Sequence, residues 1–250
     1  MRIPRILVEL PLGPVAPVTL PPGPSRYLLQ VLRRRAGDPL ILFNGDGRDY
    51  LGRLSVPAKD AIQVQLDHST EIEPPPRLGI HLGIGISKGE RMDWVVQKAV
   101  ELGVTRISPL FTKRSLVRLA GERLQQREQH WRGVLAAACE QSGRRCIPEL
   151  AAGTSLTHWL TRQYPCPLLL DPGSATALPA LSNPGEALTL LAGPEGSLAS
   201  EERALAQQAG FTTVRLGPRI LRGRKPPPWR LWRRFRHYGE TFVRMMSDEC

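Results

Sequence analysis

Paired cysteines, long apolar runs and clustered histidines are all missing from this sequence. The four cysteines include no C-x-x-C pair, which argues against a zinc site or a disulfide framework and favours a reducing, cytoplasmic environment. No run of about 18 apolar residues occurs, so we expect no membrane span, and the first residues lack the apolar core of a signal peptide. The five histidines are scattered, without metal-ligand or catalytic-triad spacing, so no bound metal is expected.

Acidic residues are outnumbered by basic ones. The 250 residues include 34 Lys and Arg against 23 Asp and Glu, which gives a net charge of +11. Such a balance favours a polyanionic partner, either nucleic acid or an anionic membrane surface, although a generally solvated basic surface would also produce it. The length allows one large or two small domains with a full core.

Residues 1–71 have the pattern of a small β-domain. Several short strands at this spacing predict a β-barrel, with an N-G-D-G turn closing a hairpin after residue 43. A Pro-rich stretch at residues 11–24 is expected to be extended loop, and residues 27–35 have apolar side chains at helical spacing. The strands are predicted at residues 2–7, with Arg2 and Arg5 exposed, and at residues 39–43, 48–54 and 61–66.

The sequence changes character at E-I-E-P-P-P, residues 71–76. Three consecutive prolines fit neither a helix nor a strand, so residues 72–76 are predicted to be a stiff linker. Beyond them apolar strands alternate with helices, which predicts an α/β domain with a mostly parallel sheet covered on both faces. Strands are expected at residues 78–86, 107–111, 166–171, 187–192 and 212–216, and helices at residues 92–102, 123–142 and 201–209.

Three of these predicted strands end in Gly- or Pro-containing loops, at L-L-D-P-G (169–173), A-G-P-E-G (192–196) and L-G-P-R-I-L-R (216–222). Each loop alone is most simply an ordinary turn. The carboxyl ends of parallel strands meet at one edge of a sheet, where α/β proteins bind ligands, so the three together favour a ligand site. Neither a G-x-G-x-x-G fingerprint nor a Walker motif is present.

A basic turn, S-K-G-E-R-M at residues 87–92, enters a predicted helix. A helix start with two cations favours a phosphate contact, although polarity at a helix start is common without any ligand.

Six motifs in order resemble one family. They are M-R-I-P-R-I at the start, F-N-G-D-G at 43–47, S-K-G-E-R-M-D-W-V-V-Q-K-A-V-E-L-G-V at 87–104, A-A-A-C-E-Q-S-G-R at 136–144, and the loops at 192–196 and 216–222. The sequence from Met1 to Arg222 is similar to ribosomal RNA small subunit methyltransferase E, the 16S rRNA uridine-N3 methyltransferases. The resemblance implies a PUA-like β-barrel followed by a SPOUT-type α/β domain with a trefoil knot. It also implies a homodimer that uses S-adenosylmethionine (SAM) and binds 16S rRNA in the small ribosomal subunit.

The resemblance also implies roles for residues. Arg222 is the candidate catalytic residue, because a cation near the uracil oxygens would stabilise charge that develops when N3 loses its proton. The residues expected to bind the cofactor, mostly through backbone, are Leu170, Asp171, Leu191, Gly193, Glu195, Gly196, Leu216, Gly217, Ile220 and Leu221. The candidates for RNA phosphates are Arg2, Arg5, Arg33, Arg34, Lys88 and Arg91.

Residues 223–250 depart from the family, in which L-R, one residue and E-T-A lead into an apolar helix. Here P-P-P follows Lys225, and three prolines forbid that helix start. In the adjacent reading frame, permitted codons restore E-T-A, an apolar helix and a stop, so we interpret the tail as a frameshift. The alternative is a genuine basic extension for rRNA. We expect reduced activity and a doubtful dimer for this chain, and the functional alternatives are a non-catalytic RNA-binding protein or a methyltransferase acting on another RNA.

Overall fold

The computed structural model describes residues 3–13, 15, 17–55, 62–115, 120–176 and 185–215 of the 250 residues. The chain divides into two compact units. The first unit comprises Met1–Pro75 with Ala136–Ile147, and the second comprises Pro76–Leu135 with Pro148–Cys250. None of the helices in the described ranges combines the length and apolar composition that crossing a bilayer requires.

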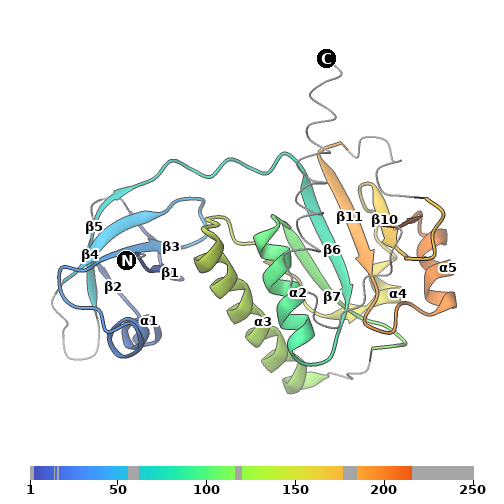
Figure 1. Cartoon of the computed structure of the whole chain (residues 1–250), viewed down its shortest axis with the longest axis horizontal. Helices are drawn as coiled ribbons and strands as arrows, with labels where there is room; N and C mark the ends of the chain where they lie inside the picture. Colours follow the sequence, from blue (N-terminus) through green and yellow to red (C-terminus); the bar gives the residue numbers. More distant parts are fainter. Residues whose placement is uncertain are drawn as a thin grey trace, which may run out of the picture. The chain divides into compact units, whose positions relative to one another are not determined.

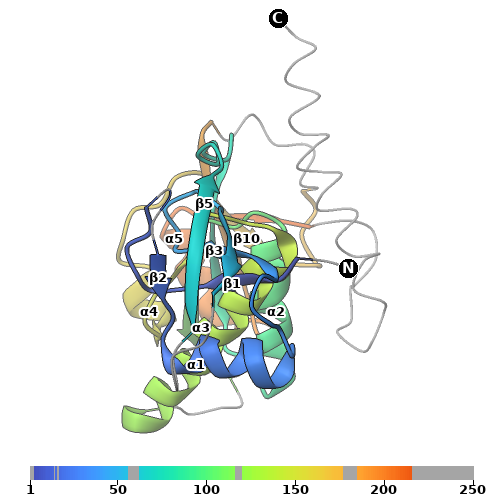
Figure 2. The ribbon, with the colours of Figure 1, turned by 90° about the vertical axis from the view of Figure 1, so that its left-hand side faces the viewer.

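The first unit is built on a five-stranded sheet with the order β1-β3-β4-β5-β2. β1 pairs with β3 in parallel and the other pairs are antiparallel, so the described strands form an open half-barrel with β1 and β2 at its edges (Figures 1 and 2). Its elements are β1 (Arg5–Leu7), β2 (Pro17–Thr19), α1 (Pro22–Arg26), the π-helical turn η1 (Tyr27–Val31), β3 (Pro39–Phe43), β4 (Tyr50–Leu54) and β5 (Gln63–Ser69).

Alternation of apolar and polar residues builds the core of this sheet. In β5 the even-numbered Val64 and Leu66 are buried and their odd-numbered neighbours are exposed, because successive side chains of a strand point to opposite faces. They pack with Leu28 of η1 and with Leu40 and Leu42 of β3 in one apolar cluster.

Two details of this unit differ from the sequence-based expectation. The Pro-rich stretch contains β2 and the start of α1 in place of an all-extended loop, and the expected helix over residues 27–35 is a shorter π-helical turn. Pro17 is tolerated because it is the first residue of an edge strand, where a missing N–H costs little. Pro22 and Pro24 occupy the first turn of α1, where helical N–H groups have no partner within the helix.

The start of the segment predicted to be a linker is anchored within the first unit. The backbone N–H of Glu73 donates to the carbonyl of Gly47 at 2.7 Å. The Glu73 carboxylate accepts hydrogen bonds from the backbone N–H groups of Arg145 at 2.7 Å and Cys146 at 2.8 Å. The chain is therefore tied to the half-barrel up to Glu73.

The second unit contains a parallel sheet with the order β12-β10-β11-β6-β7-β8, and β9 also pairs with β7. Figures 1 and 2 show α2 and α3 on one side of the sheet and α4 and α5 on the other. Its elements are β6 (Gly79–Gly85), α2 (Glu90–Glu101), β7 (Arg106–Phe111), α3 (Gly121–Ser142, whose end is grouped with the first unit), β8 (Glu149–Leu150), β9 (Thr154–Ser155), α4 (Leu156–Trp159), β10 (Pro167–Leu170), β11 (Ala187–Ala192), α5 (Ser200–Gln208) and β12 (Thr212–Val214). The prediction of an α/β domain with a covered parallel sheet is confirmed.

Aromatic side chains form the core between this sheet and the helices α4 and α5. Trp159 is 2% exposed and stacks on Tyr164, with ring centroids 4.3 Å apart. Phe211 and the inward-facing Leu169 and Leu191 of neighbouring strands belong to the same cluster. This cluster therefore packs β10 and β11 against α4 and α5.

Candidate functional site

The ends of adjacent parallel strands form the candidate site. β10 pairs with β11, β11 with β6, and β6 with β7, all in parallel, so the loops that follow them emerge at one edge. Figure 1 shows the arrowheads of β6 and β11 pointing to this edge. The prediction that the loops after residues 170 and 192 meet at a common edge is therefore confirmed. The third predicted loop, residues 216–222, lies outside the described residues.

Backbone packs very closely where β6 meets the loop at residues 193–196. A Cβ atom on Gly85 would collide with the ring and backbone nitrogen of Pro194, and one on Gly193 would lie 2.7 Å from the backbone nitrogen of Leu198. Only glycine fits at both positions without movement of the backbone. The loop is thus folded tightly over the end of β6, and residues 195–197 are exposed.

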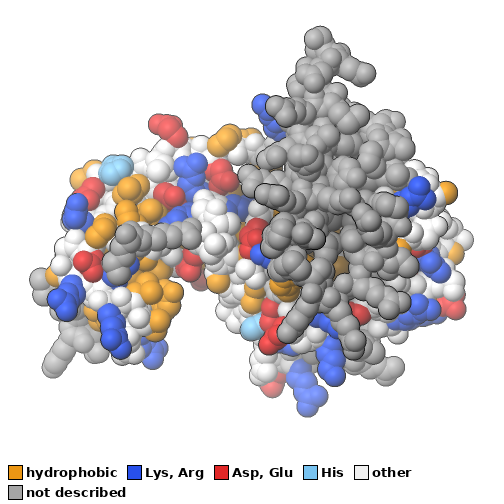
Figure 3. Space-filling model, viewed as in Figure 1, with side chains coloured by type: hydrophobic (Ala, Val, Ile, Leu, Met, Phe, Trp, Pro, Cys, Tyr) orange, Lys and Arg blue, Asp and Glu red, His pale blue; other side chains and the backbone are white. Residues whose placement is uncertain are grey.

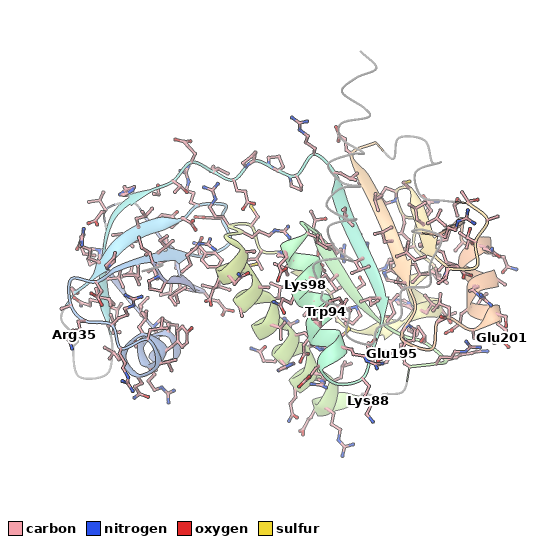
Figure 4. The ribbon with its side chains drawn as sticks, viewed as in Figure 1. Arg35, Lys88, Trp94, Lys98, Glu195 and Glu201 are labelled. Carbon is pink, nitrogen blue, oxygen red and sulfur yellow. The ribbon has the colours of Figure 1, made fainter. Side chains whose placement is uncertain are left out.

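Glu195 joins this loop to the start of α2. Its Oε1 atom accepts a hydrogen bond from the backbone N–H of Lys88 at 3.2 Å and pairs with Nη1 of Arg91 at 3.1 Å. Burial opposes ionisation of the carboxylate, but hydrogen bonds from backbone N–H groups and from Arg91 outweigh it and hold the pKa of Glu195 below its ordinary value. In Figure 4 Glu195 and Lys88 lie close together, whereas Glu201 lies apart from them on α5.

The loop after β7 holds the other side of residues 193–196. Arg114 donates from Nη1 to the carbonyl of Gly196 at 2.8 Å. The carboxylate of Glu202, which is 6% exposed, accepts from the backbone N–H groups of Lys113 at 2.7 Å and Ala199 at 2.9 Å. Sequence reasoning missed Arg114 and Glu202. The available signals were a Lys-Arg pair directly after a strand and a Glu pair at a helix start.

Leu170, Asp171 and Leu191 occupy the neighbouring strand ends. The Asp171 carboxylate accepts a hydrogen bond from the backbone N–H of Gly173 at 2.9 Å and pairs with Arg203 at 3.0 Å, so it shapes its own turn. The side chain of Leu191 is fully buried. The expected contact of Leu191 with the cofactor therefore stays a prediction.

The predicted phosphate contacts fall into different environments. Lys88, Arg91 and Arg33 are exposed, and Arg33 has a positive φ of 51°. Arg34 is half-buried. On the face of the first unit seen in Figure 3, basic side chains lie beside apolar ones, and three large apolar residues of η1, Tyr27, Leu29 and Val31, are among the exposed ones.

The expectation of an exposed Arg5 is wrong. Its side chain is 8% exposed and pairs with Asp49 at 2.6 Å. Nη1 also donates to the carbonyl of Cys139 at 2.7 Å, and the guanidinium lies over the ring of Phe43, 4.5 Å from its centroid. Arg5 is a structural cation of the first unit, because burial of its charge is compensated by these contacts.

The remaining predicted site residues lie outside the described residues. They are Arg2, Leu216, Gly217, Ile220, Leu221 and Arg222.

Comparisons with known proteins identify the relatives of this fold. A family profile described as an RNA methyltransferase domain matches residues 74–224, and one described as an RNA methyltransferase PUA domain matches residues 25–67. Ribosomal RNA small subunit methyltransferase E of Buchnera aphidicola subsp. Schizaphis graminum is 31% identical over 225 residues, which cover 88% of this chain and 91% of the relative. The chain belongs to the ribosomal RNA small subunit methyltransferase E family.

Two solved structures are similar to this member of the family over nearly its whole length. The family enzyme from Neisseria gonorrhoeae, bound to S-adenosyl methionine, has a TM-score of 0.84 and 32% identity, covering 95% of this chain and 97% of the neighbour. A protein from Legionella pneumophila, solved with the cofactor SAM, has a TM-score of 0.84 and 34% identity, covering 89% and 92%. The α/β domain with an N-terminal PUA-like domain is therefore the fold of this family.

Proposed function

We propose that this chain is a SAM-dependent methyltransferase that acts on N3 of a uridine in 16S rRNA of the small ribosomal subunit. We propose that it acts in the cytoplasm and, following the family resemblance, that it is a homodimer. The observation that supports the proposal best is the sheet edge at which Leu170, Asp171 and residues 193–196 come together. The first unit, the linker and the second unit would serve as the RNA-binding domain, spacer and methyltransferase domain over residues 1–71, 72–76 and 77–222.

The described residues fit a flat cofactor such as SAM. The loop at residues 193–196 follows β11 at the sheet edge where α/β sheets bind ligands, and its residues 195 and 196 are exposed there. When bound, SAM supplies an electrophilic methyl group. Leu170, Asp171, Leu191, Gly193, Glu195 and Gly196 would hold it from the described side, and Leu216, Gly217, Ile220 and Leu221 from the remaining loop.

The chemistry that the protein must supply is positioning and charge stabilisation. Methyl transfer from a sulfonium is an in-line displacement, and holding the two reactants in line contributes much of the rate. N3 of uracil carries a proton and becomes nucleophilic only when that proton is lost, which places negative charge on the ring. We propose that Arg222 stabilises this charge near the uracil oxygens.

The RNA would be oriented by exposed cations. Lys88 and Arg91 lie at the start of α2, next to the proposed cofactor loop, and Arg33 and Arg34 lie in the first unit. Phosphate contacts of this type fix register on the RNA and carry little sequence information.

We also propose that residues 223–250 lower the activity of this chain. Where the family resemblance predicts E-T-A and an apolar helix, this chain has a Pro- and Arg-rich sequence, and three consecutive prolines disfavour a helix because each one disfavours the helical conformation of the residue before it. The origin of the tail is testable independently of activity. We expect resequencing of the gene around the codons for Leu221–Lys225 to reveal a shifted frame, and a clean frame confirmed on the purified protein would contradict this.

The function is tested with small subunits from a strain that lacks the modification, incubated with labelled SAM. We expect label at N3 of a 16S uridine, strong with a chain whose frame is restored after Arg222 and at least tenfold weaker with the present chain. Comparable turnover by the two chains would contradict the impairment. RNA binding without SAM binding in calorimetry would identify a non-catalytic RNA-binding protein, and label in tRNA would identify another substrate.

A further inference from the structure

Glu195 connects two sets of residues that the proposed function assigns to different ligands. It belongs to the loop at residues 193–196, proposed to hold SAM, and it contacts Lys88 and Arg91, proposed to contact RNA. We propose that Glu195 is a positioning residue that fastens this loop to the start of α2 and, in doing so, weakens RNA binding by Arg91. The expected effects of Glu195 on SAM and RNA binding rest on the proposed function, whereas its expected effect on the loop does not.

The loop is held at separate points along its length. Pro194 packs against Gly85 at the end of β6, and the Gly196 carbonyl accepts from Arg114. Between these two points, Glu195 is the residue that reaches α2. Loss of its negative charge leaves the loop attached to β6 and to the β7 loop. A glutamine oxygen can still accept from Lys88 and Arg91, but the bonds lose their charge assistance, so the link to α2 weakens. This predicts local loosening and no unfolding of the sheet.

The groups that hold Glu195 are also groups that bind phosphate. A backbone N–H at a helix start and a guanidinium are the usual donors to a phosphate oxygen. The side chain of Arg91 is 53% exposed and that of Glu195 is 22% exposed, so the cation is within reach of a polyanion while its charge is partly neutralised by the protein itself. A carboxylate at this position also repels an approaching phosphate.

Two opposite effects follow from the Glu195→Gln substitution. The loop should loosen, so SAM should bind more weakly. Arg91 should be held only by a neutral amide oxygen and the local repulsion should disappear, so RNA should bind more tightly. Substitution of a residue that only supports the fold would weaken the binding of SAM and of RNA together. Opposite changes in the two affinities therefore distinguish a positioning residue from a structural one.

The first measurement is hydrogen exchange on the whole chain without any ligand. In Glu195→Gln we expect the amides of residues 195–198 to exchange about fivefold faster, with the central strands unchanged. Arg91→Met removes the partner from the other side and should accelerate the same amides by a similar factor. Unchanged exchange in both variants would overturn the proposal, whatever the function of the chain.

The second measurement is affinity, by calorimetry for SAM and by fluorescence anisotropy for a single-stranded RNA oligonucleotide in a series of KCl concentrations. For Glu195→Gln we expect the Kd for SAM to rise about fivefold and the Kd for RNA to fall about threefold, which is the range of one partly exposed ion pair. The slope of the logarithm of the RNA association constant against the logarithm of the KCl concentration should steepen by about 0.7, the value for one additional phosphate contact on a single strand. Adding Arg91→Met to this variant should abolish the gain in RNA affinity.

The matched control is Glu201→Gln. Glu201 pairs with Lys113 and its side chain is 69% exposed. Its substitution removes the same charge from a carboxylate that pairs with Lys113 and not with Arg91 of α2. Its Kd for SAM and its loop exchange should equal those of the unmodified chain. An equal gain in RNA affinity in this control, or weaker RNA binding in Glu195→Gln, would overturn the proposal. Absence of SAM binding by the unmodified chain would contradict the proposed function, while the ligand-free exchange measurement would still decide the role of Glu195 in the loop.

Discussion

The two units use their arginines in contrasting ways. In the first unit Arg5 is 8% exposed and bonds to Asp49 and to carbonyl groups near the end of α3, so its charge serves the fold. In the second unit the side chain of Arg91 is 53% exposed and pairs with the loop carboxylate of Glu195, so much of its charge faces solvent. Both were candidates for RNA contacts on the basis of sequence. The difference teaches that a basic residue near the start of an element identifies a nucleic-acid surface only when the fold leaves its guanidinium outside.

The largest effect is expected where the charge is buried. Arg5→Met should lower the free energy of unfolding by about 3 kcal/mol, because it leaves Asp49 without its cation and removes the contacts to the Cys139 carbonyl and the Phe43 ring. Denaturant unfolding measures this change. Asp49→Asn and the double variant complete a cycle that should give a clear coupling energy. A loss below about 0.5 kcal/mol would place Arg5 with the surface cations, and the contrast between the units would fail.

A second contrast lies between two glycines. Gly193→Ala should cost about 2 kcal/mol and displace the loop, because its Cβ would meet the backbone of Ser197 and Leu198. Gly133→Ala, in the exposed middle of α3 with nothing within 4 Å of the added Cβ, should instead stabilise by roughly 0.5–1 kcal/mol. Thermal unfolding of both variants checks the opposite signs. A Gly193→Ala protein as stable as the unmodified chain would contradict the close backbone packing at the site.

His81 makes the stability of the second unit depend on pH. Burial first, and then the charges of Arg106 and Arg162, lower the pKa of His81 to about 4, and its ring bonds to the Ser108 hydroxyl at 2.8 Å. The unfolded chain binds this proton near pH 6.5 and the folded chain only near pH 4, so stability should fall as the pH drops through that interval and level off above it.

Equilibrium unfolding between pH 4 and 7 measures this slope. His81→Gln should flatten it. An unchanged slope in His81→Gln would show that other groups cause the pH dependence of stability.

The smallest effect on stability is expected at Arg33. Arg33→Met should change the free energy of unfolding by less than about 0.5 kcal/mol, since the side chain is exposed. RNA affinity should nevertheless fall about threefold and the salt slope should decrease by about 0.7. Arg33→Lys keeps the charge and should retain the slope. An unchanged RNA affinity in Arg33→Met would remove this residue from the proposed RNA surface.

Much of the second unit was predictable from sequence because buried parallel strands are continuous apolar runs. The expected strand over residues 187–192 coincides with β11 (Ala187–Ala192), and the expected helices lie within two residues of α2, α3 and α5. The four-residue helix α4 was missed because it has no period to detect. Its Trp159 nevertheless stands at the centre of the aromatic cluster.

The candidate site was predictable in position but not in its bonds. Strand ends converge by topology, so the loops after residues 170 and 192 could be placed at one edge. The contacts of Glu195 with Arg91 and of Arg114 with Gly196 join residues about a hundred and about eighty positions apart. Local pattern contains no information on such pairs, and for the same reason it could not indicate that Arg5 would be enclosed.

Methylation of small ribosomal subunits that lack the modification tests the central claim most directly. The labelled 16S rRNA would be digested to nucleosides and the methylated product identified. We expect 3-methyluridine, formed in a SAM-dependent manner, abundantly with the frame-restored chain and at least tenfold less with the present one. The absence of 3-methyluridine with both chains, or methylation at another atom, would contradict the account.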